Sequence, residues 1–125
     1  MKRLVLSLAL LSALFLVGCW QKDVGRSYYP SGALRTEATV RNGLLDGPST
    51  MYYESGAKMS AAHYRSGILD GFSVSYFENG RKKTTAMYKD GYLDGLSSAW
   101  SESGGLLAEA RFEQGRLIPK EQDSK

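Results

Sequence analysis

The sequence predicts an all-β protein, an elongated antiparallel meander of β-hairpins with about eight strands, built from four 24-residue repeats. The first observation is that two series of glycines each recur every 24 residues, namely Gly32, Gly56, Gly80 and Gly104, and Gly43, Gly67, Gly91 and Gly115. The second is an aromatic column with the same interval, formed by Tyr28, Tyr52, Tyr76 and Trp100. Runs rich in aromatic and β-branched residues lie between the glycines and favour strands. Repetition at this period indicates one supersecondary unit stacked four times.

The N-terminal residues are predicted to form a helical signal peptide over residues 1–18, ahead of the repeats. A basic start, with Lys2 and Arg3, is followed by the uncharged run from Leu4 to Val17. As a helix that rises about 1.5 Å per residue, this run spans roughly 21 Å, which is shorter than the bilayer hydrocarbon core of about 30 Å. A short apolar run after a basic segment is typical of a secretory signal rather than a membrane anchor.

The end of this segment, Leu16-Val17-Gly18-Cys19, resembles the lipobox of bacterial lipoproteins. The resemblance implies cleavage before Cys19, attachment of lipid to the Cys19 thiol, and a short lipidated linker over 19–24. Two or three acyl chains together give stable membrane anchoring. An Asp directly after the cysteine would resemble a signal for retention in the inner membrane, but Trp20 stands at this position. We therefore expect the protein to be anchored in the outer membrane, facing the periplasm, if the organism is Gram-negative. The alternative is an ordinary secreted protein with a leftover cysteine.

The four copies are predicted to span 25–48, 49–72, 73–96 and 97–120, followed by a polar tail over 121–125. Each copy has a strand, a turn containing Ser-Gly or Asn-Gly, a second strand and a second turn such as Asn42-Gly43. Glycine adopts positive φ without steric cost, and Asn or Asp before it tolerates the same region, so each pair predicts a tight reversal. A copy therefore holds two strands of about six residues.

Alternation along the strands predicts which side chains face the interior. A column of alanines, Ala38, Ala62, Ala86 and Ala110, lies two residues before a column of large residues, Val40, Tyr64, Tyr88 and Phe112. Residues two apart on a strand share a face, so both columns are expected on the core side. In the fourth copy Ile118-Pro119 replaces Asp-Gly, and Pro119 cannot donate to a further strand. We therefore expect this copy to cap the array.

Taken together, the unit Tyr-Tyr-x-Ser/Asn-Gly, Ala-x-Tyr and Gly-x-Leu-Asp-Gly resembles the MORN-repeat variant, a bacterial relative of the membrane-occupation-and-recognition-nexus repeat. This variant is often filed with YwqK-like antitoxins. The resemblance covers the residues after the linker and implies an elongated all-β array of hairpins. It brings no catalytic motif, because the shared residues are structural.

Composition and spacing disfavour several kinds of chemistry. The chain has 16 Lys and Arg against 13 Asp and Glu, and the balance falls to +1 without Lys2 and Arg3, so no basic footprint for nucleic acid is expected. Asp46, Asp70 and Asp94 recur before glycines, but one copy advances a sheet by about 9.6 Å, too far for three carboxylates to share a calcium ion. We expect these aspartates to be turn residues. No cofactor, metal site or enzymatic activity is expected.

Neighbouring aromatics give the one candidate binding surface. On a regular strand, sequence neighbours such as Tyr52 and Tyr53 point to opposite faces. One stripe is therefore expected in the core, and the other is expected to lie at least partly open as an aromatic stripe, formed by Tyr29, Tyr53 and Phe77. Exposed contiguous aromatics often mark an interaction surface. The alternative is that strand twist and long neighbouring side chains cover these rings.

These observations predict a lipid-anchored, non-enzymatic repeat protein that presents a β surface to a protein partner at the bacterial cell envelope. The partner is not identified by the sequence. An antitoxin or immunity role is the first alternative, with the toxin acting in the envelope. Binding of saccharide or of the membrane surface is the second alternative, because aromatic stripes also stack on sugars.

Overall fold

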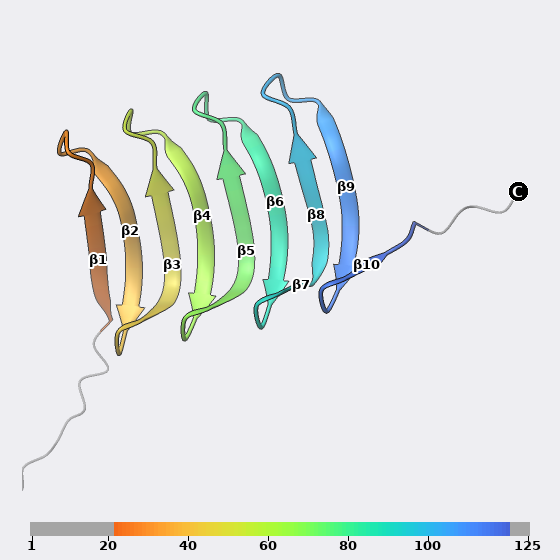
Figure 1. Cartoon of the computed structure of the whole chain (residues 1–125), viewed down its shortest axis with the longest axis horizontal. Helices are drawn as coiled ribbons and strands as arrows, with labels where there is room; N and C mark the ends of the chain where they lie inside the picture. Colours follow the sequence, from red (N-terminus) through yellow and green to blue (C-terminus); the bar gives the residue numbers. More distant parts are fainter. Residues whose placement is uncertain (1–21, 121–125) are drawn as a thin grey trace, which may run out of the picture.

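The computed structural model describes residues 22–120, which form one open antiparallel β-sheet without helices (Figure 1). The strands follow one another across the sheet in chain order, except that the short β7 pairs with β6 beside β8. Their bounds are β1 (Asp23–Tyr28), β2 (Leu34–Arg41), β3 (Leu44–Tyr52), β4 (Lys58–Arg65), β5 (Ile68–Tyr76), β6 (Lys82–Lys89), β7 (Tyr92–Leu93), β8 (Gly95–Trp100), β9 (Leu106–Glu113) and β10 (Arg116–Ile118). The predicted all-β meander is confirmed.

Two-residue turns connect neighbouring strands at one end of the sheet, here called the turn end. Asn42 and Gly43, between β2 and β3, both have positive φ, 51° and 77°. This is the type I′ geometry, whose twist matches that of the flanking strands. The same pairing of a positive-φ residue with glycine recurs at Ser66-Gly67, Asp90-Gly91 and Gln114-Gly115. The tight reversals are therefore those that the sequence predicts.

Longer loops connect the strands at the other end of the sheet, here called the loop end, and their hydrogen bonds are the same in every copy. In the first, the amide of Tyr29 donates to the carbonyl of Ala33 at 2.8 Å, and the amide of Gly32 donates to the carbonyl of Tyr29 at 2.9 Å. Gly32 has φ of 88°, which only glycine adopts without strain. Equivalent pairs of hydrogen bonds begin at Tyr53, Phe77 and Ser101.

The Asp-Gly pairs are not turns, and this prediction is wrong. Asp46 and Gly47 lie inside β3, at a bulge where the register passes from Ala38↔Ser49 to Val40↔Leu45. Residues 46–48 thus face the single residue Thr39, and Gly47 has φ of 131°. A Cβ on Gly47 would lie 3.2 Å from the Cβ of Thr39, so a side chain there would require Thr39 to shift and would be strained at this φ.

One of the bulges and an additional short strand after the last turn explain why the sheet has ten strands rather than about eight. β3 and β5 run through their bulges and are nine residues long, whereas the third bulge separates β7 from β8 at Asp94. After the last turn the chain adds β10, which ends before Pro119. At the other terminus β1 begins at Asp23, inside the segment predicted as a linker over 19–24.

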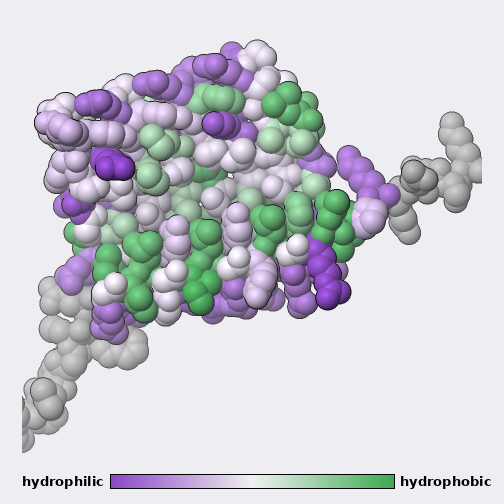
Figure 2. Space-filling model, in the orientation of Figure 1, coloured by the Kyte–Doolittle hydropathy of each residue, from purple (hydrophilic) through white to green (hydrophobic). Residues whose placement is uncertain are grey.

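The sheet is a single layer, and nothing among the described residues covers either face. Residues paired across strands share a face, so Ala38↔Ser49, Ala62↔Ser73 and Ser97↔Ala110 place a row of small residues on one side, here called the Ala/Ser face. Beside it runs a row of larger residues, Val40, Leu45, Tyr64, Leu69, Tyr88, Leu93, Phe112 and Leu117. In Figure 2 hydrophobic side chains cross the sheet near the two-residue turns, below a paler band.

Burial is shallow as a result. Ala38, 7% exposed, is the one buried apolar residue of the part that the structure describes. The predicted core column is only half-buried at Tyr64, Tyr88 and Phe112. In the other aromatic column, Tyr28 on the edge strand is 58% exposed, whereas Tyr52, Tyr76 and Trp100 are half-buried as well. Away from the edge, the two aromatic columns are therefore covered to a similar degree.

Candidate interaction surface

The predicted aromatic stripe lies where strands give way to loops. Tyr29, Tyr53 and Phe77 directly follow β1, β3 and β5, each after an irregularity in the register, and all three are half-buried. They open the longer loops rather than standing on regular strands. The simple alternation that the sequence suggested does not apply there.

Two of these aromatics connect consecutive copies. The hydroxyl of Tyr29 donates to the carbonyl of Tyr52 at 2.7 Å, and the hydroxyl of Tyr53 donates to the carbonyl of Tyr76 at 2.8 Å. Each phenol thus satisfies the last carbonyl of a strand in the next copy. These rings hold the loop ends of the sheet together.

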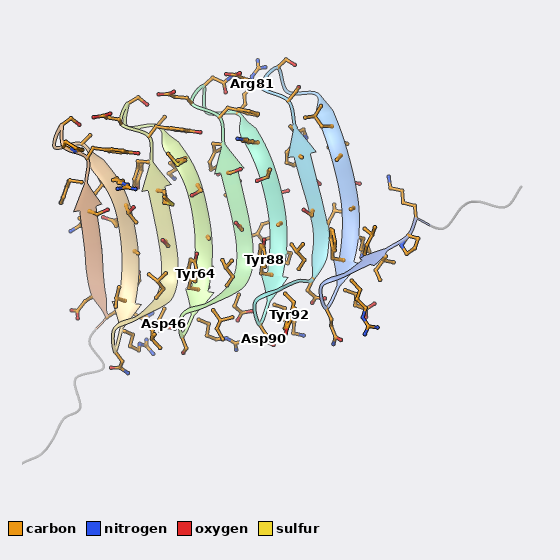
Figure 3. All side chains as sticks on the ribbon, viewed as in Figure 1. Asp46, Tyr64, Arg81, Tyr88, Asp90 and Tyr92 are labelled. Atoms are coloured by element: carbon orange, nitrogen blue, oxygen red, sulfur yellow. The ribbon has the colours of Figure 1, made fainter. Side chains whose placement is uncertain are left out.

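The third junction is made differently, because Phe77 has no hydroxyl. There the guanidinium of Arg81 donates to the carbonyl of Glu102 at 3.3 Å and to the carbonyl of Ser103, and Figure 3 shows Arg81 at the loop end of the sheet. The side-chain amide of Asn79 donates to the same Glu102 carbonyl at 3.4 Å. Arg81 therefore connects the third and fourth copies in place of a tyrosine hydroxyl.

Cations lie over the stripe at two places. The guanidinium carbon of Arg35 is 5.8 Å from the centre of the Tyr29 ring, and the ammonium of Lys83 is 5.6 Å from that of the Phe77 ring. Cation–π contacts at exposed sites of this kind are worth about 0.5–1 kcal/mol. The stripe is thus partly covered by its own neighbours.

The recurrent aspartates hold the turn end together. Asp46 pairs with Arg41 at 3.2 Å and accepts a hydrogen bond from the amide of Ser66 in the next turn, also at 3.2 Å. Asp94 accepts from the amide of Gln114 at 3.3 Å in the same way. Within residues 22–120 no group of three His, Cys, Asp or Glu side chains is placed to hold a metal ion. These carboxylates have structural partners at both positions.

A second surface was missed by the sequence reasoning. Of the exposed large hydrophobic side chains on the face opposite the Ala/Ser face, we call five the Leu/Phe patch: Leu44, Ile68, Phe72, Tyr92 and Leu96. Their exposed fractions are 50%, 51%, 62%, 63% and 46%, in that order. Monomeric proteins rarely leave so many large apolar side chains open side by side.

The repeat places three patch residues in one row along the turn end. Leu44, Ile68 and Tyr92 each directly follow a turn glycine. The side chain of each one lies close to the glycine of the next turn. The ideal Cβ position of Gly91, for example, is 3.2 Å from Cγ2 of Ile68, and that of Gly115 is 3.4 Å from Cδ1 of Tyr92. Figure 3 shows Tyr92 at this end, below Tyr64 and Tyr88. The row is therefore fixed by backbone turns.

The signal for the patch was present in the sequence. The residue after each turn glycine is apolar in the first three copies, as is the residue after each Asp-Gly pair: Leu44, Ile68 and Tyr92, and Pro48, Phe72 and Leu96. Phe72 pairs with Met87 across the strands, which extends the apolar area. A hollow lined by Lys89, Asp90, Tyr92, Asp94, Glu113 and Gln114 adjoins the patch.

Comparison with known proteins supports the class defined by this fold, an open β-meander repeat protein. Residues 45–66 match the family model described as the MORN repeat variant, which supports a MORN-repeat protein. No curated protein matches the chain. A solved structure from Streptococcus pneumoniae, of accessory secretory protein 1, 2 and 3, is similar with a TM-score of 0.42 and 15% identity; the match covers 77% of this chain and 18% of that one.

Two further predictions concern the membrane. The signal peptide and Cys19 lie outside the described residues. Over residues 22–120 the chain contains no helix long and apolar enough to cross a bilayer.

Proposed function

We propose that this protein is a non-enzymatic MORN-repeat module that binds a protein partner at the bacterial cell envelope, held there by lipid on Cys19. The observation that carries the proposal is the Leu/Phe patch on a sheet whose faces no other part of residues 22–120 covers. Fully burying one large apolar side chain is worth about 1.5–3 kcal/mol, so covering five half-exposed ones supplies on the order of several kcal/mol. A protein surface of matching shape provides that cover.

The geometry favours a flat contact with a protein. The patch is set on paired strands, so its side chains are held in place before binding and little conformational entropy is lost. Phe72 and Tyr92 are large rings of the type enriched in interface cores, and each is more than 60% exposed. The half-buried aromatic stripe of Tyr29, Tyr53 and Phe77 offers a secondary contact at the loop end.

The anchor in this proposal keeps the sheet close to the membrane. Only residues 20–22 separate Cys19 from the start of β1 at Asp23, and four residue steps span at most about 14 Å. The partner is therefore expected to be membrane-bound or to work near the membrane surface. Labelling with radioactive palmitate should mark the parent chain and not Cys19→Ala; labelling of both would contradict the anchor.

The test replaces the patch and uses matched exposed leucines as the control. A photo-crosslinking residue is placed at position 89, an exposed lysine that pairs with Tyr92 across the strands and therefore lies beside the patch on the same face. The triple variant Leu44→Ser, Phe72→Ser, Tyr92→Ser is expected to lose at least about nine-tenths of the crosslinked partner. The control Leu106→Ser, Leu107→Ser, at positions 57% and 70% exposed, is expected to keep it.

The identity of the crosslinked species separates the remaining classes. An immunity role is identified if the captured protein is the product of a neighbouring gene and becomes toxic to the cell when the gene for this protein is deleted. Co-sedimentation with purified cell wall, unaffected by the triple variant, contradicts a protein partner at the patch and favours saccharide. Loss of capture in the control as well contradicts the patch as its site.

A further inference from the structure

The two lateral edges of the sheet are open in a complementary way. Every residue of β1 is exposed, and its outer side has no neighbouring strand among the described residues. At the other edge β10 pairs only with Arg111–Glu113 of β9, so Leu106–Ala110 have no strand on their outer side in the same part of the chain. Unpaired edges of this kind are templates for a further strand.

The repeat shows what is missing beside β9. Arg116 and Leu117 of β10 occupy the places that Leu44 and Leu45 have in β3, three copies earlier. β3 continues to Tyr52, whereas β10 ends at Ile118, the equivalent of Asp46. The vacant places thus correspond to residues 47–52. One copy earlier, these positions are residues 23–28, the whole of β1.

We propose that the protein associates head to tail, with β1 of one copy completing the edge beside β9 of a second copy. Repeat equivalence sets the register. Ser49↔Ala38, Thr50↔Glu37 and Met51↔Thr36 within the chain become Gly25–Ala110, Arg26–Glu109 and Ser27–Ala108 between copies. The occupant is a second copy of this chain because the missing strand and the free strand have the same length and position in the repeat.

Charges on the two edges agree with this register. Arg26 lies on β1, where it already pairs with Glu37 at 2.7 Å, and its side chain is 50% exposed. Glu109 on β9 is exposed and accepts a long hydrogen bond of 3.3 Å from Ser98. In the joint, Arg26 lies between Glu37 and the second copy's equivalent of that residue, Glu109. The same register brings Asp23 and Val24 opposite Arg111.

The joint is heterologous, because different surfaces of the two copies meet. Such contacts extend into open chains of molecules unless the rotation closes a ring. Affinity comes from main-chain hydrogen bonds between the edges, as when an extended peptide adds a strand to a sheet. Assembly at the membrane surface, where copies are concentrated, is therefore expected to exceed assembly in dilute solution.

The experiment uses cysteine crosslinking of the full chain in intact cells. Gly25→Cys and Ala110→Cys would face each other at the 4.5–5.5 Å Cα separation of an antiparallel pair, which suits a disulfide. They cannot meet within one molecule, because seven strand spacings of about 4.8 Å separate them by roughly 34 Å. A Cβ on Gly25 has only ordinary contacts, at 3.7 Å or more.

In cells that express both single variants, the two chains are expected to form a disulfide-linked dimer after mild oxidation. The double variant is expected to form a series of larger crosslinked species, because each chain can crosslink at both edges. The parent chain reports any background from Cys19. Either single variant alone should stay monomeric; dimers from one of them show that like edges meet and overturn the proposal. Absence of the mixed dimer, with both chains present at parental levels, also overturns it.

Charge reversal tests the register independently. Arg26→Glu and Glu109→Lys are each expected to reduce the crosslinked fraction about tenfold, which corresponds to about 1.4 kcal/mol, and together to restore it. Lys82→Glu, an exposed charge change away from both edges, is the control. Equal loss in the control, or no restoration in the pair, contradicts the Arg26–Glu109 contact.

Discussion

The three junctions between consecutive copies share the same backbone contacts at the turn end but differ in their side-chain contacts at the loop end. At the turn end, each junction has a bulge glycine and a turn amide bonded to the carbonyl of the preceding copy's leucine, for example Gly91 to Leu69 at 2.8 Å. At the loop end, the first two junctions use a tyrosine hydroxyl and the third uses Arg81. The backbone contacts are constant because they set the register, whereas any donor that reaches the next loop serves at the other end.

The largest effect is expected from a change to the shared backbone contacts. Gly71→Val forces a branched side chain to φ of 120° and places its Cβ 3.4 Å from that of His63. Backbone strain of this kind costs about 1–3 kcal/mol, and the contact adds to it. We expect the free energy of unfolding in urea to fall by about 3 kcal/mol. Gly25→Ala, without positive φ, should change it by less than about 0.5 kcal/mol; equal losses would show that the bulge is not special.

A smaller effect is expected from removing one phenol hydroxyl. Tyr53→Phe leaves the carbonyl of Tyr76 without its 2.8 Å donor in a half-buried place. A lost hydrogen bond of this type costs about 0.5–1.5 kcal/mol. Urea unfolding should show a loss of about 1 kcal/mol. Tyr64→Phe is the control, because the Tyr64 hydroxyl forms no hydrogen bond with another residue of the described part of the chain. A similar loss of stability in Tyr64→Phe would show that the hydrogen bond to Tyr76 is not the cause.

The smallest effect concerns the third junction and sharpens the comparison. Arg81→Ala is expected to cost about 0.5–1 kcal/mol, because exposed side-chain hydrogen bonds contribute little. Adding Phe77→Tyr should recover about half or more of that loss, by supplying the hydroxyl that the first two junctions use. A double-mutant cycle on unfolding free energies measures this coupling. Strict additivity of the two changes would mean that the two solutions are not interchangeable.

Local rules predicted the reversals well. A residue such as Asn42 followed by Gly43 needs only its own φ preferences to form a type I′ turn, so the sequence is sufficient there. The Asp46-Gly47 pair has a similar composition but forms a bulge, because its geometry depends on Thr39 in the neighbouring strand. Composition alone does not distinguish these two cases.

The candidate surfaces depended on information that is not local. The sequence marked Tyr29 and Tyr53 as an open stripe, but their hydroxyls reach carbonyls 23 residues away. The Leu/Phe patch was overlooked because apolar residues such as Phe72 are ordinarily buried, and only the absence of a second layer leaves them open. The lipid on Cys19 and the partner remain predictions.

A sheet one layer thick also changes how the protein responds to heat. The usual rise in heat capacity on unfolding comes from apolar surface newly wetted by water. Here water already reaches most side chains in the folded state, since Ala38 is the one buried apolar residue over residues 22–120. We therefore expect a smaller heat-capacity change on unfolding, and a less strongly curved stability curve, than for a globular domain of equal length.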